Sequence, residues 1–238
     1  MSVKTRERQK GKDQYQPFRA AQSGHWQTPD KSEFICREYN YWLYVNLNDY
    51  LDSGLFIDSR GVRRWIRTEA KNKTFLNLFA YTGSATLAAI MGGARASLSL
   101  DISATYQDWA RRNFQLNAVN ARAHQLRQVD CVKWLDKVEQ KYDLILLDPP
   151  SFSNSKRMQN SLDIERDHVE LIQLAIDHLA PEGKLLFCCN KKGFKLAESL
   201  LALYDIEELT RATVDEDCRN SRQSHRSWLF ERCYRSVQ

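Results

Sequence analysis

The 238-residue sequence contains no apolar run of the roughly 18 to 20 residues that a membrane-spanning helix needs. Its N-terminus is charged from the fourth residue onward and lacks the apolar core of a secretory signal peptide. These two absences predict no membrane contact, with a cytoplasmic location as the default expectation. The length accommodates one α/β domain with an appendage, and the hydrophobic fraction of 42% is ordinary for a globular protein.

The six cysteines form no Cys-x-x-Cys pair, and no spacing of cysteine and histidine matches a zinc site. Cys188 and Cys189 are adjacent, and adjacent cysteines rarely bridge each other, so reduced thiols in a reducing compartment are expected. The sequence therefore predicts no metal. The fingerprint G-x-G-x-x-G of dinucleotide-binding sites is also missing, which counts against an NAD-dependent oxidoreductase.

Positive charge is concentrated at the N-terminus. Residues 1–12 hold five basic residues, among them Lys4, Arg6 and Arg8, against one acidic residue, and so carry +4 of the formal net charge of +5. A short basic arm on a near-neutral body suits contact with the phosphate backbone of a nucleic acid. A solvated linker to a further part of a longer chain is the other interpretation, and both can hold. Residues 1–32 show no apolar period and are expected to form this arm or linker.

The pattern of apolar residues changes after the arm. Residues 33–60 are expected to form a β-hairpin and a loop, because alternating apolar runs at 34–36 and 42–45 flank Tyr39-Asn40. Strands and helices then alternate over 61–238, and 142–147 is a continuous apolar strand typical of a parallel sheet buried on both faces. This order predicts an α/β fold of the Rossmann-like type, with a doubly wound, mostly parallel seven-stranded sheet and an antiparallel end.

The expected elements have the following bounds. Strands are predicted at 74–78, 96–100, 123–129, 142–147, 184–189, 206–212 and 227–233. Helices are predicted at 62–70, 84–91, 103–117, 132–138, 163–179 and 196–203. Thr82 or Ser84 is the expected N-cap of the helix at 84–91, and Ser103 caps the next helix.

Open α/β sheets bind ligands beyond the carboxyl ends of their strands, so the residues that follow each strand are the candidates for a site. Gly83 and its small polar neighbours follow the first strand, where backbone can approach a ligand and a helix N-terminus favours a carboxylate. Asp101 follows the second strand, where an acidic side chain can accept ribose hydroxyl protons. Asp130 follows the third, in reach of an exocyclic adenine amine. Singly, these are also a turn glycine, a turn aspartate and a helix cap, but their order favours a nucleotide-like ligand.

The fourth strand runs into Asp148-Pro149-Pro150-Ser151-Phe152. Two consecutive prolines fix a rigid extended turn and remove two backbone donors. A carboxylate and carbonyl oxygens remain, with an aromatic ring close by. This arrangement suits a flat heterocycle that stacks on the ring and is held by its polar edge. A stiff loop with a core phenylalanine is the alternative interpretation.

Together these residues resemble class I RNA methyltransferases of the RlmI/RlmK group, which act on 23S rRNA with S-adenosylmethionine. The resemblance is carried by 75–86, Asp101, Asp130 and 148–152, and by 54–60, which is similar to that group's Gly-x-Phe-Leu-Asp-x-Arg segment. Further similar segments are 4–11, 154–158 and 190–194. The resemblance implies methylation of guanine N7 in 23S rRNA. It also implies a longer natural polypeptide, with an RNA-binding module and a guanine-N2 methyltransferase upstream.

Site residues follow from the same resemblance. Base-binding and catalytic positions are Asp148, Pro149, Pro150 and Phe152. Cofactor contacts are expected from Phe56, Asp58, Arg60, Asn77, Phe79, Tyr81, Thr82, Gly83, Asp101, Ile102, Asp130, Cys131 and Asp148. Among these, Arg60 or a neighbour is expected to pair with the cofactor carboxylate. RNA contacts are expected from Lys4, Arg6, Arg8, Lys156, Arg157, Lys191 and Lys192.

Two chemistries remain open at this point. Guanine N7 carries an in-plane lone pair and needs no deprotonation, so Asp148 would orient the base. Cytosine C5 must instead be activated by a thiolate, and Cys189 stands at the end of the fifth strand, where related cytosine enzymes place theirs. The other interpretation is that both cysteines are small residues filling a strand end, which the guanine-type segment 190–194 favours. A non-catalytic RNA-binding or assembly module is the alternative from another class.

Overall fold

The computed structural model describes residues 33–47, 49, 52–137, 139–153, 162–219 and 225–231. The predicted arm at 1–32, with Lys4, Arg6 and Arg8, lies outside the described residues, as do the predicted phosphate contacts Lys156 and Arg157.

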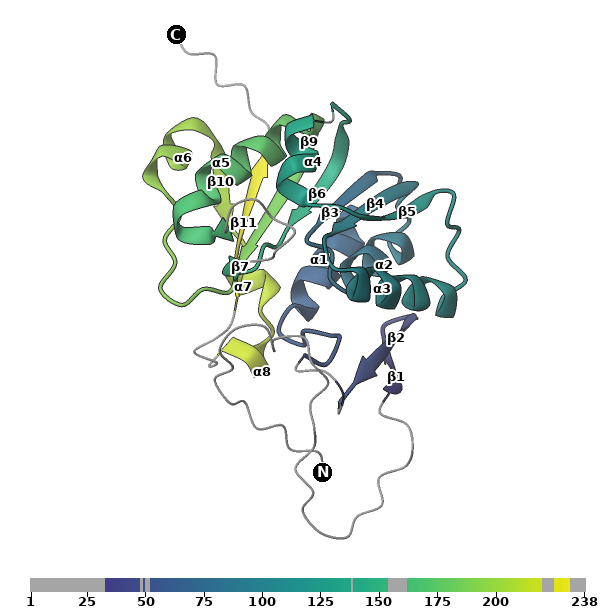
Figure 1. The fold of residues 1–238 in the computed structure, drawn as a ribbon. Helices are drawn as coiled ribbons and strands as arrows, with labels where there is room; N and C mark the ends of the chain where they lie inside the picture. The colour runs from purple at the N-terminus through teal and green to yellow at the C-terminus, as the bar shows by residue number, and fades with distance from the viewer. Residues whose placement is uncertain are drawn as a thin grey trace.

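A seven-stranded sheet forms the centre of the molecule, in the order β10-β11-β9-β6-β3-β4-β5 (Figure 1). Its strands are β3 (Thr74–Leu78), β4 (Ala96–Asp101), β5 (His124–Gln128), β6 (Tyr142–Leu147), β9 (Leu179–Cys189), β10 (Asp205–Glu208) and β11 (Arg226–Glu231). The five strands from β9 to β5 pair in parallel, whereas β11 is antiparallel to both β9 and β10. The predicted mostly parallel sheet with an antiparallel end is confirmed.

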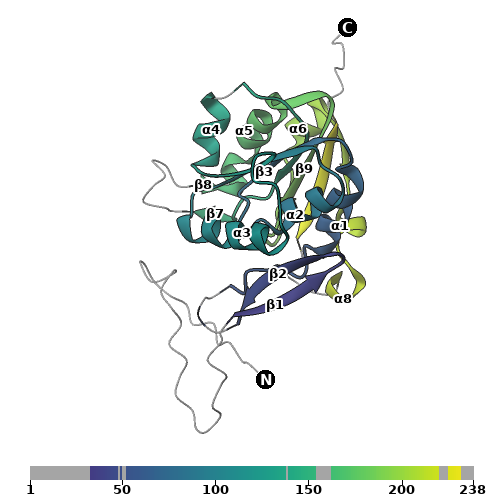
Figure 2. The same ribbon diagram turned by 90° about the vertical axis from the view of Figure 1, so that its right-hand side faces the viewer.

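Helices cover both faces of this sheet (Figure 2). One layer contains α1 (Arg60–Glu69), α2 (Ser84–Met91) and α3 (Ala104–Leu116), and the other contains α4 (Cys131–Lys137), α5 (Ile164–Asp177) and α6 (Glu198–Leu203). Side chains of β6 point alternately to the two faces of the sheet. Ile145 and Leu147 pack against the layer that contains α5, and Leu144 and Leu146 against the layer that contains α1. Because both faces are buried, the sequence of β6 is a continuous apolar run. No helix in the described ranges is both long and apolar enough to cross a membrane.

The N-terminal hairpin consists of β1 (Glu33–Glu38) and β2 (Tyr41–Asn46), which pair antiparallel as predicted. It lies against α2 and α3 (Figure 2), where Tyr41 and Leu43 enter a small core with Phe114. Asn113 and Asn117 of α3 accept hydrogen bonds from backbone N–H groups of β2, at 2.9 and 2.8 Å. These contacts fix the hairpin to the helical layer.

Several predicted element ends differ from the observed ones. The N-cap of α2 is Gly83, at φ 75°, and not Thr82 or Ser84, because the Thr82 hydroxyl donates to a carbonyl of another segment. Ser103 caps α3 as predicted. The strand predicted at 206–212 ends at Glu208, and α7 (Thr210–Thr213) follows it. The helix predicted at 163–179 ends at Asp177, so β9 begins earlier than expected. The short elements β7 (Phe152–Ser153), β8 (Leu162–Asp163) and α8 (Glu216–Arg219) were not predicted.

Candidate active site

The loops that follow β3, β4, β6 and β9 meet at the carboxyl edge of the sheet, where ligands of open α/β sheets bind. Because β11 is antiparallel to β9, it begins at this same edge. The segment that precedes α1 also reaches it, through contacts with the loop after β3. A pocket lined by Thr74, Ala96 and Ser97 lies at the amino ends of the strands and takes no part in the site.

The loop after β3 has a strained backbone. Phe79 (φ 59°) and Tyr81 (φ 51°) are left-handed, which costs about 1–2 kcal/mol for each non-glycine residue. Hydrogen bonds to the neighbouring strand hold this conformation, since the N–H groups of Ala80 and Tyr81 donate at 2.9 Å to the Leu100 carbonyl and the Asp101 carboxylate. No side chain caps α2, so the backbone N–H groups of its first turn are open to an anionic ligand.

Asp101 is held in place at the end of β4. One carboxylate oxygen accepts from the Ser103 N–H at 2.8 Å and the other from the Tyr81 N–H at 2.9 Å. Burial raises the pKa of the Asp101 carboxyl above its ordinary value. The two N–H donors lower this pKa, but by less than burial raises it. Each oxygen keeps a further accepting lone pair. The carboxylate therefore fits the predicted role of accepting from two ribose hydroxyls.

Asn77 and Thr82 lie beneath the loop. Asn77 is 1% exposed and donates at 2.9 Å to the Thr86 hydroxyl, which bonds in turn to Ser99. Thr82 is fully buried and donates at 2.7 Å to the Gly54 carbonyl. Both side chains thus bond within the protein and support the loop. Contact of these two residues with the cofactor stays a prediction.

Asp130 and Cys131 begin α4. The Asp130 carboxylate caps this helix, accepting at 3.1 and 3.5 Å from two backbone N–H groups of its first turn, which was the alternative interpretation of this residue. The buried Cys131 sulfur accepts from the Phe79 N–H at 3.3 Å and so supports the strained loop. Ile102, directly after β4, is half-buried, and its carbonyl accepts from the Gln128 amide at 3.2 Å. The contact of Asp130 with an adenine amine stays a prediction.

The segment before α1 passes close to the loop after β3. Gly54 (φ 86°) donates its N–H to the Tyr81 hydroxyl at 3.0 Å, and a Cβ at this position would come within 2.1 Å of the Trp109 ring. Only glycine fits there. The Phe56 ring lies 5.1 Å from the Tyr81 ring, centroid to centroid, and Phe56 stays 45% exposed. These contacts place the predicted Phe56 beside the predicted Tyr81 at the rim of the site.

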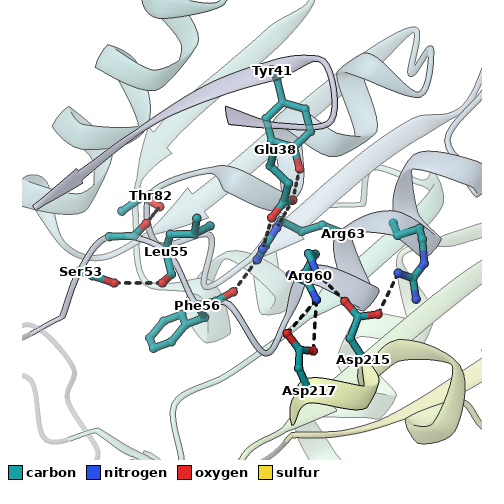
Figure 3. Close-up of polar contacts among 12 residues, drawn as sticks. Glu38, Tyr41, Ser53, Leu55, Phe56, Arg60, Arg63, Thr82, Asp215 and Asp217 are labelled. Atoms are coloured by element: carbon teal, nitrogen blue, oxygen red, sulfur yellow. Dashed lines mark hydrogen bonds and ion pairs between the residues drawn. The ribbon is translucent and has the colours of Figure 1, made fainter. Parts of the chain in front are cut away.

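Arg63 joins the hairpin to this segment (Figure 3). Its guanidinium is 2% exposed and donates to both carboxylate oxygens of Glu38 at 2.7 and 2.6 Å, and to the Phe56 carbonyl at 2.8 Å. The Tyr41 hydroxyl donates to the same carboxylate. One buried ion pair therefore fixes the position of the rim relative to the hairpin.

Arg60 forms ion pairs with the segment that follows α7. Figure 3 shows its guanidinium between Asp215 and Asp217, to which it donates at 2.5 and 3.2 Å. Two carboxylates of the segment after α7 thus already compensate the charge of Arg60. The pairing of Arg60 or a neighbour with the cofactor carboxylate stays a prediction.

Asp148 follows β6 on a rigid loop. Removal from water raises the pKa of its carboxyl to about 6; the nearby His225 acts against this rise and the Asp58 carboxylate adds to it. The Ser151 hydroxyl donates to the Asn190 side chain at 2.6 Å and ties the loop to the end of β9. Phe152 is 61% exposed, which excludes the core-phenylalanine interpretation and leaves its ring free to stack on a base. Pro149 is buried and Pro150 exposed.

His225 was missed by the sequence interpretation. It immediately precedes β11, and its Nδ1 lies 3.9 Å from an Asp58 carboxylate oxygen. This imidazole, outweighing the opposite effect of burial, lowers the pKa of the Asp58 carboxyl. The antiparallel end of the predicted sheet was the available signal, because the start of such a strand lies at the carboxyl edge of its parallel neighbours.

The two cysteines at the end of β9 are buried and face opposite layers. Cys189 packs in the α5 layer with Phe187 and Phe194, and Cys188 packs in the α1 layer. Burial raises the pKa of both thiols above its ordinary value, which disfavours the thiolate needed for nucleophilic attack. This geometry matches small residues that fill a strand end.

The predicted RNA contacts after β9 differ from each other. The Lys191 ammonium lies 2.8 Å from the Glu165 carboxylate and 3.3 Å from that of Asp163, so it fixes the loop to the start of α5. Lys192 is exposed and is the better placed of the two for a phosphate. Within the described ranges, no cluster of three or more His, Cys, Asp or Glu side chains is arranged to hold a metal ion.

Known proteins resemble this chain over most of its length. Residues 13–208 match a family described as S-adenosylmethionine-dependent methyltransferase. The chain is 47% identical over 230 residues to the ribosomal RNA large subunit methyltransferase K/L of Cellvibrio japonicus (strain Ueda107), and 47% identical over 229 residues to the protein of that name from Marinomonas sp. (strain MWYL1). The aligned residues make up 97% and 96% of this chain but 30% of each relative.

Among solved structures, the putative methyltransferase SMU.776, complexed with SAH, has a TM-score of 0.74 and 25% identity over 87% of this chain and 58% of that chain. The resemblance predicted from the sequence is thereby confirmed, as is the expectation of S-adenosylmethionine as cofactor.

Proposed function

The chain belongs to the S-adenosylmethionine-dependent methyltransferase family, and on that premise we propose that it methylates N7 of a guanine in 23S rRNA. The names of the two relatives, at 47% identity, support a large-subunit ribosomal RNA substrate. Because the chain spans 30% of their length, we also propose that a guanine-N2 methyltransferase and an RNA-binding module lie upstream in the natural polypeptide. Residues 1–32 and Lys192 would then contribute phosphate contacts.

The proposal depends mainly on the loop that carries Asp148. A carboxylate at the end of a buried strand, on two prolines and beside the exposed ring of Phe152, is built to hold a planar base. Guanine offers a carboxylate two adjacent donors, N1–H and the 2-amino group. Phe152 would stack on the ring while Asp148 accepts from that edge, which leaves N7 on the other side of the base free to react.

Methyl transfer to guanine N7 requires few further groups from the protein. When bound, S-adenosylmethionine supplies an electrophilic methyl group on its sulfonium. Guanine N7 attacks with an in-plane lone pair, so no general base is required and alignment supplies most of the rate enhancement. In the proposed complex, the Asp101 carboxylate and the uncapped α2 would hold the cofactor on one side, and Asp148 would hold the base on the other.

Cytosine C5 methylation is the second candidate, because a thiol stands at the end of β9. It requires a thiolate that reaches the base. Cys189 is 2% exposed, and its side chain packs among Phe187 and Phe194 in the core. A Cys189→Ala variant is therefore expected to keep full activity, and loss of activity with intact cofactor binding would favour the cytosine reaction.

Nucleoside mass spectrometry tests the proposal directly. The chain is incubated with S-adenosylmethionine and unmodified 23S rRNA, and the digested RNA is expected to contain 7-methylguanosine. A product that is solely 5-methylcytosine would overturn it. RNA without new methylation, from a protein that shows no thermal shift with S-adenosylhomocysteine, would instead support a non-catalytic module.

A further inference from the structure

His225 differs from the other histidines that the structure describes. Each of the others bonds to the protein through at least one ring nitrogen; they are His124, His168 and His178. His225 is 3% exposed, and neither ring nitrogen has a hydrogen-bond partner among the described residues. Buried polar groups are nearly always paired, and an exception calls for an explanation such as a missing ligand.

The position of His225 assigns it to the substrate side of the site. Arg226, the next residue, pairs with Cys189 at the carboxyl end of β9. Strand β9 is the neighbour of β6, which runs into Asp148. The cofactor-side loops follow β3 and β4, on the other side of β6 in the sheet order. The imidazole is therefore separated from Asp101 by the strand that carries the base-binding loop.

Two carboxylates share this edge of the sheet with the imidazole. Nδ1 lies 3.9 Å from the Asp58 carboxylate, too far for a hydrogen bond but close enough for one to form with a small shift on ligand binding. A second carboxylate, that of Asp148, follows the neighbouring strand β6 at the same edge of the sheet, and the imidazole opposes the rise of its pKa. Nδ1 is the nitrogen nearer to Asp58, so Nε2, which has no partner among the described residues, remains for a ligand.

We propose that His225, as an imidazolium with an N–H on each ring nitrogen, donates a hydrogen bond from Nε2 to O6 of the target guanine, while Asp58 accepts from Nδ1–H and orients the ring. Guanine presents O6, N1–H and the 2-amino group in a row, and an N–H donor next to a carboxylate complements all three. Cytosine offers a single donor group and two acceptors, so the same pair satisfies it less completely. Because O6 lies next to N7, the bond fixes the base close to the reacting atom. This inference rests on the proposed function and assigns Asp58 to the substrate, not to the cofactor.

Paired variants test the role of the N–H donor. His225→Leu removes it and fills the same space, whereas His225→Gln keeps an N–H group. In single-turnover assays with unmodified 23S rRNA, His225→Leu is expected to form 7-methylguanosine about 10- to 100-fold more slowly, and His225→Gln to recover part of that loss. Affinity for S-adenosylhomocysteine, measured by calorimetry, is expected to stay within about twofold for both.

His124→Leu is the matched control. It is the same substitution at a buried histidine, at the amino end of β5 and away from the site. Any general effect of exchanging a buried imidazole for an apolar side chain appears there as lower stability with an unchanged methylation rate. An unchanged rate in His225→Leu would overturn the inference, as would a loss of cofactor affinity as large as the loss of rate.

A measurement on the unsubstituted protein covers the case in which the variants do not fold. Chain with ¹⁵N-labelled histidine is saturated with S-adenosylhomocysteine and then titrated with 5′-GMP or 5′-CMP. One imidazole is expected to shift with GMP and not with CMP, and the absence of any shift would contradict the inference. Failure of the proposed function is recognised separately, because the unsubstituted chain would then yield no 7-methylguanosine at all.

Discussion

The cofactor side and the substrate side of the site satisfy their polar groups differently. On the cofactor side, the Asp101 carboxylate accepts two backbone N–H groups, and Asn77 and Thr82 bond within the protein. On the proposed substrate side, the described residues give His225 no hydrogen-bond partner. A pre-organised cofactor side would lower the ordering cost of binding the cofactor, whereas in our proposal His225 gains its partner only when a base binds.

The largest expected effect concerns the support of the cofactor side. Arg63→Ala leaves the buried Glu38 carboxylate and the Phe56 carbonyl without their donor. Breaking a buried ion pair from one side typically costs about 3–5 kcal/mol, which we expect as the loss of unfolding free energy in urea titrations. Cofactor affinity should fall as well, because the rim segment loses its anchor.

Arg64→Ala is its control. Arg64 is half-exposed and pairs with Asp215, so its loss should cost under about 1 kcal/mol. Equal losses from the two variants would show that the buried pair does not anchor the hairpin, and the cofactor side would then be less rigidly built than we infer.

Asp148→Asn is expected to give the next largest effect. The amide presents one acceptor and sets a donor against the guanine N–H groups, so methyl transfer should slow by about 100-fold through misplacement of the base. Affinity for S-adenosylhomocysteine, measured by calorimetry, should change little. An equal loss of cofactor affinity would move Asp148 to the cofactor side, where the sequence also placed it.

The pH dependence of the reaction is a second way to distinguish the substrate side from the cofactor side. Burial raises the pKa of Asp148 to about 6, so its carboxylate form, which accepts from guanine, dominates above that pH and is lost below it. The value of kcat/KM is therefore expected to fall about tenfold per pH unit below roughly pH 6. Cofactor affinity should not follow this profile. A flat profile in the unsubstituted chain would show that Asp148 does not act as an acceptor.

Asp101→Ala is expected to have the smallest effect. Loss of a carboxylate that accepts from ribose hydroxyls should weaken cofactor binding about tenfold in calorimetry, and saturating cofactor should restore the rate. Asp108→Ala on α3 is the control, because Asp108 is exposed and pairs with neighbouring arginines of the same helix. Unchanged affinity in Asp101→Ala would contradict the ribose assignment.

Local pattern explains what the sequence could predict. The apolar run at 142–147 and the alternation of strands and helices specify a buried parallel sheet, and that sheet places Asp101 and Asp148 at one edge without knowledge of any contact. The hairpin followed from two alternating runs around a turn. These are features of neighbouring residues, where periodicity carries the information.

Contacts between distant segments explain what could not be predicted. Arg60 pairs with Asp215, 155 positions away, and nothing in the local sequence distinguishes that partner from a cofactor carboxylate. Thr82 looked like a helix cap but bonds to Gly54, which leaves the cap to Gly83. His225 lies in no motif, and the pairing of β11 with β9 brings it to the carboxyl edge of the sheet.

The place of β11 between β9 and β10 also has a consequence for the order of events during synthesis. The segments that form the cofactor side, from Gly54 to Cys131, leave the ribosome first and can begin to associate. The sheet cannot close until residues 226–231 insert between two strands made earlier. A nascent chain can therefore assemble the proposed cofactor side before the proposed substrate side, so the methylation that we propose for this chain would have to wait for the last strand of the sheet.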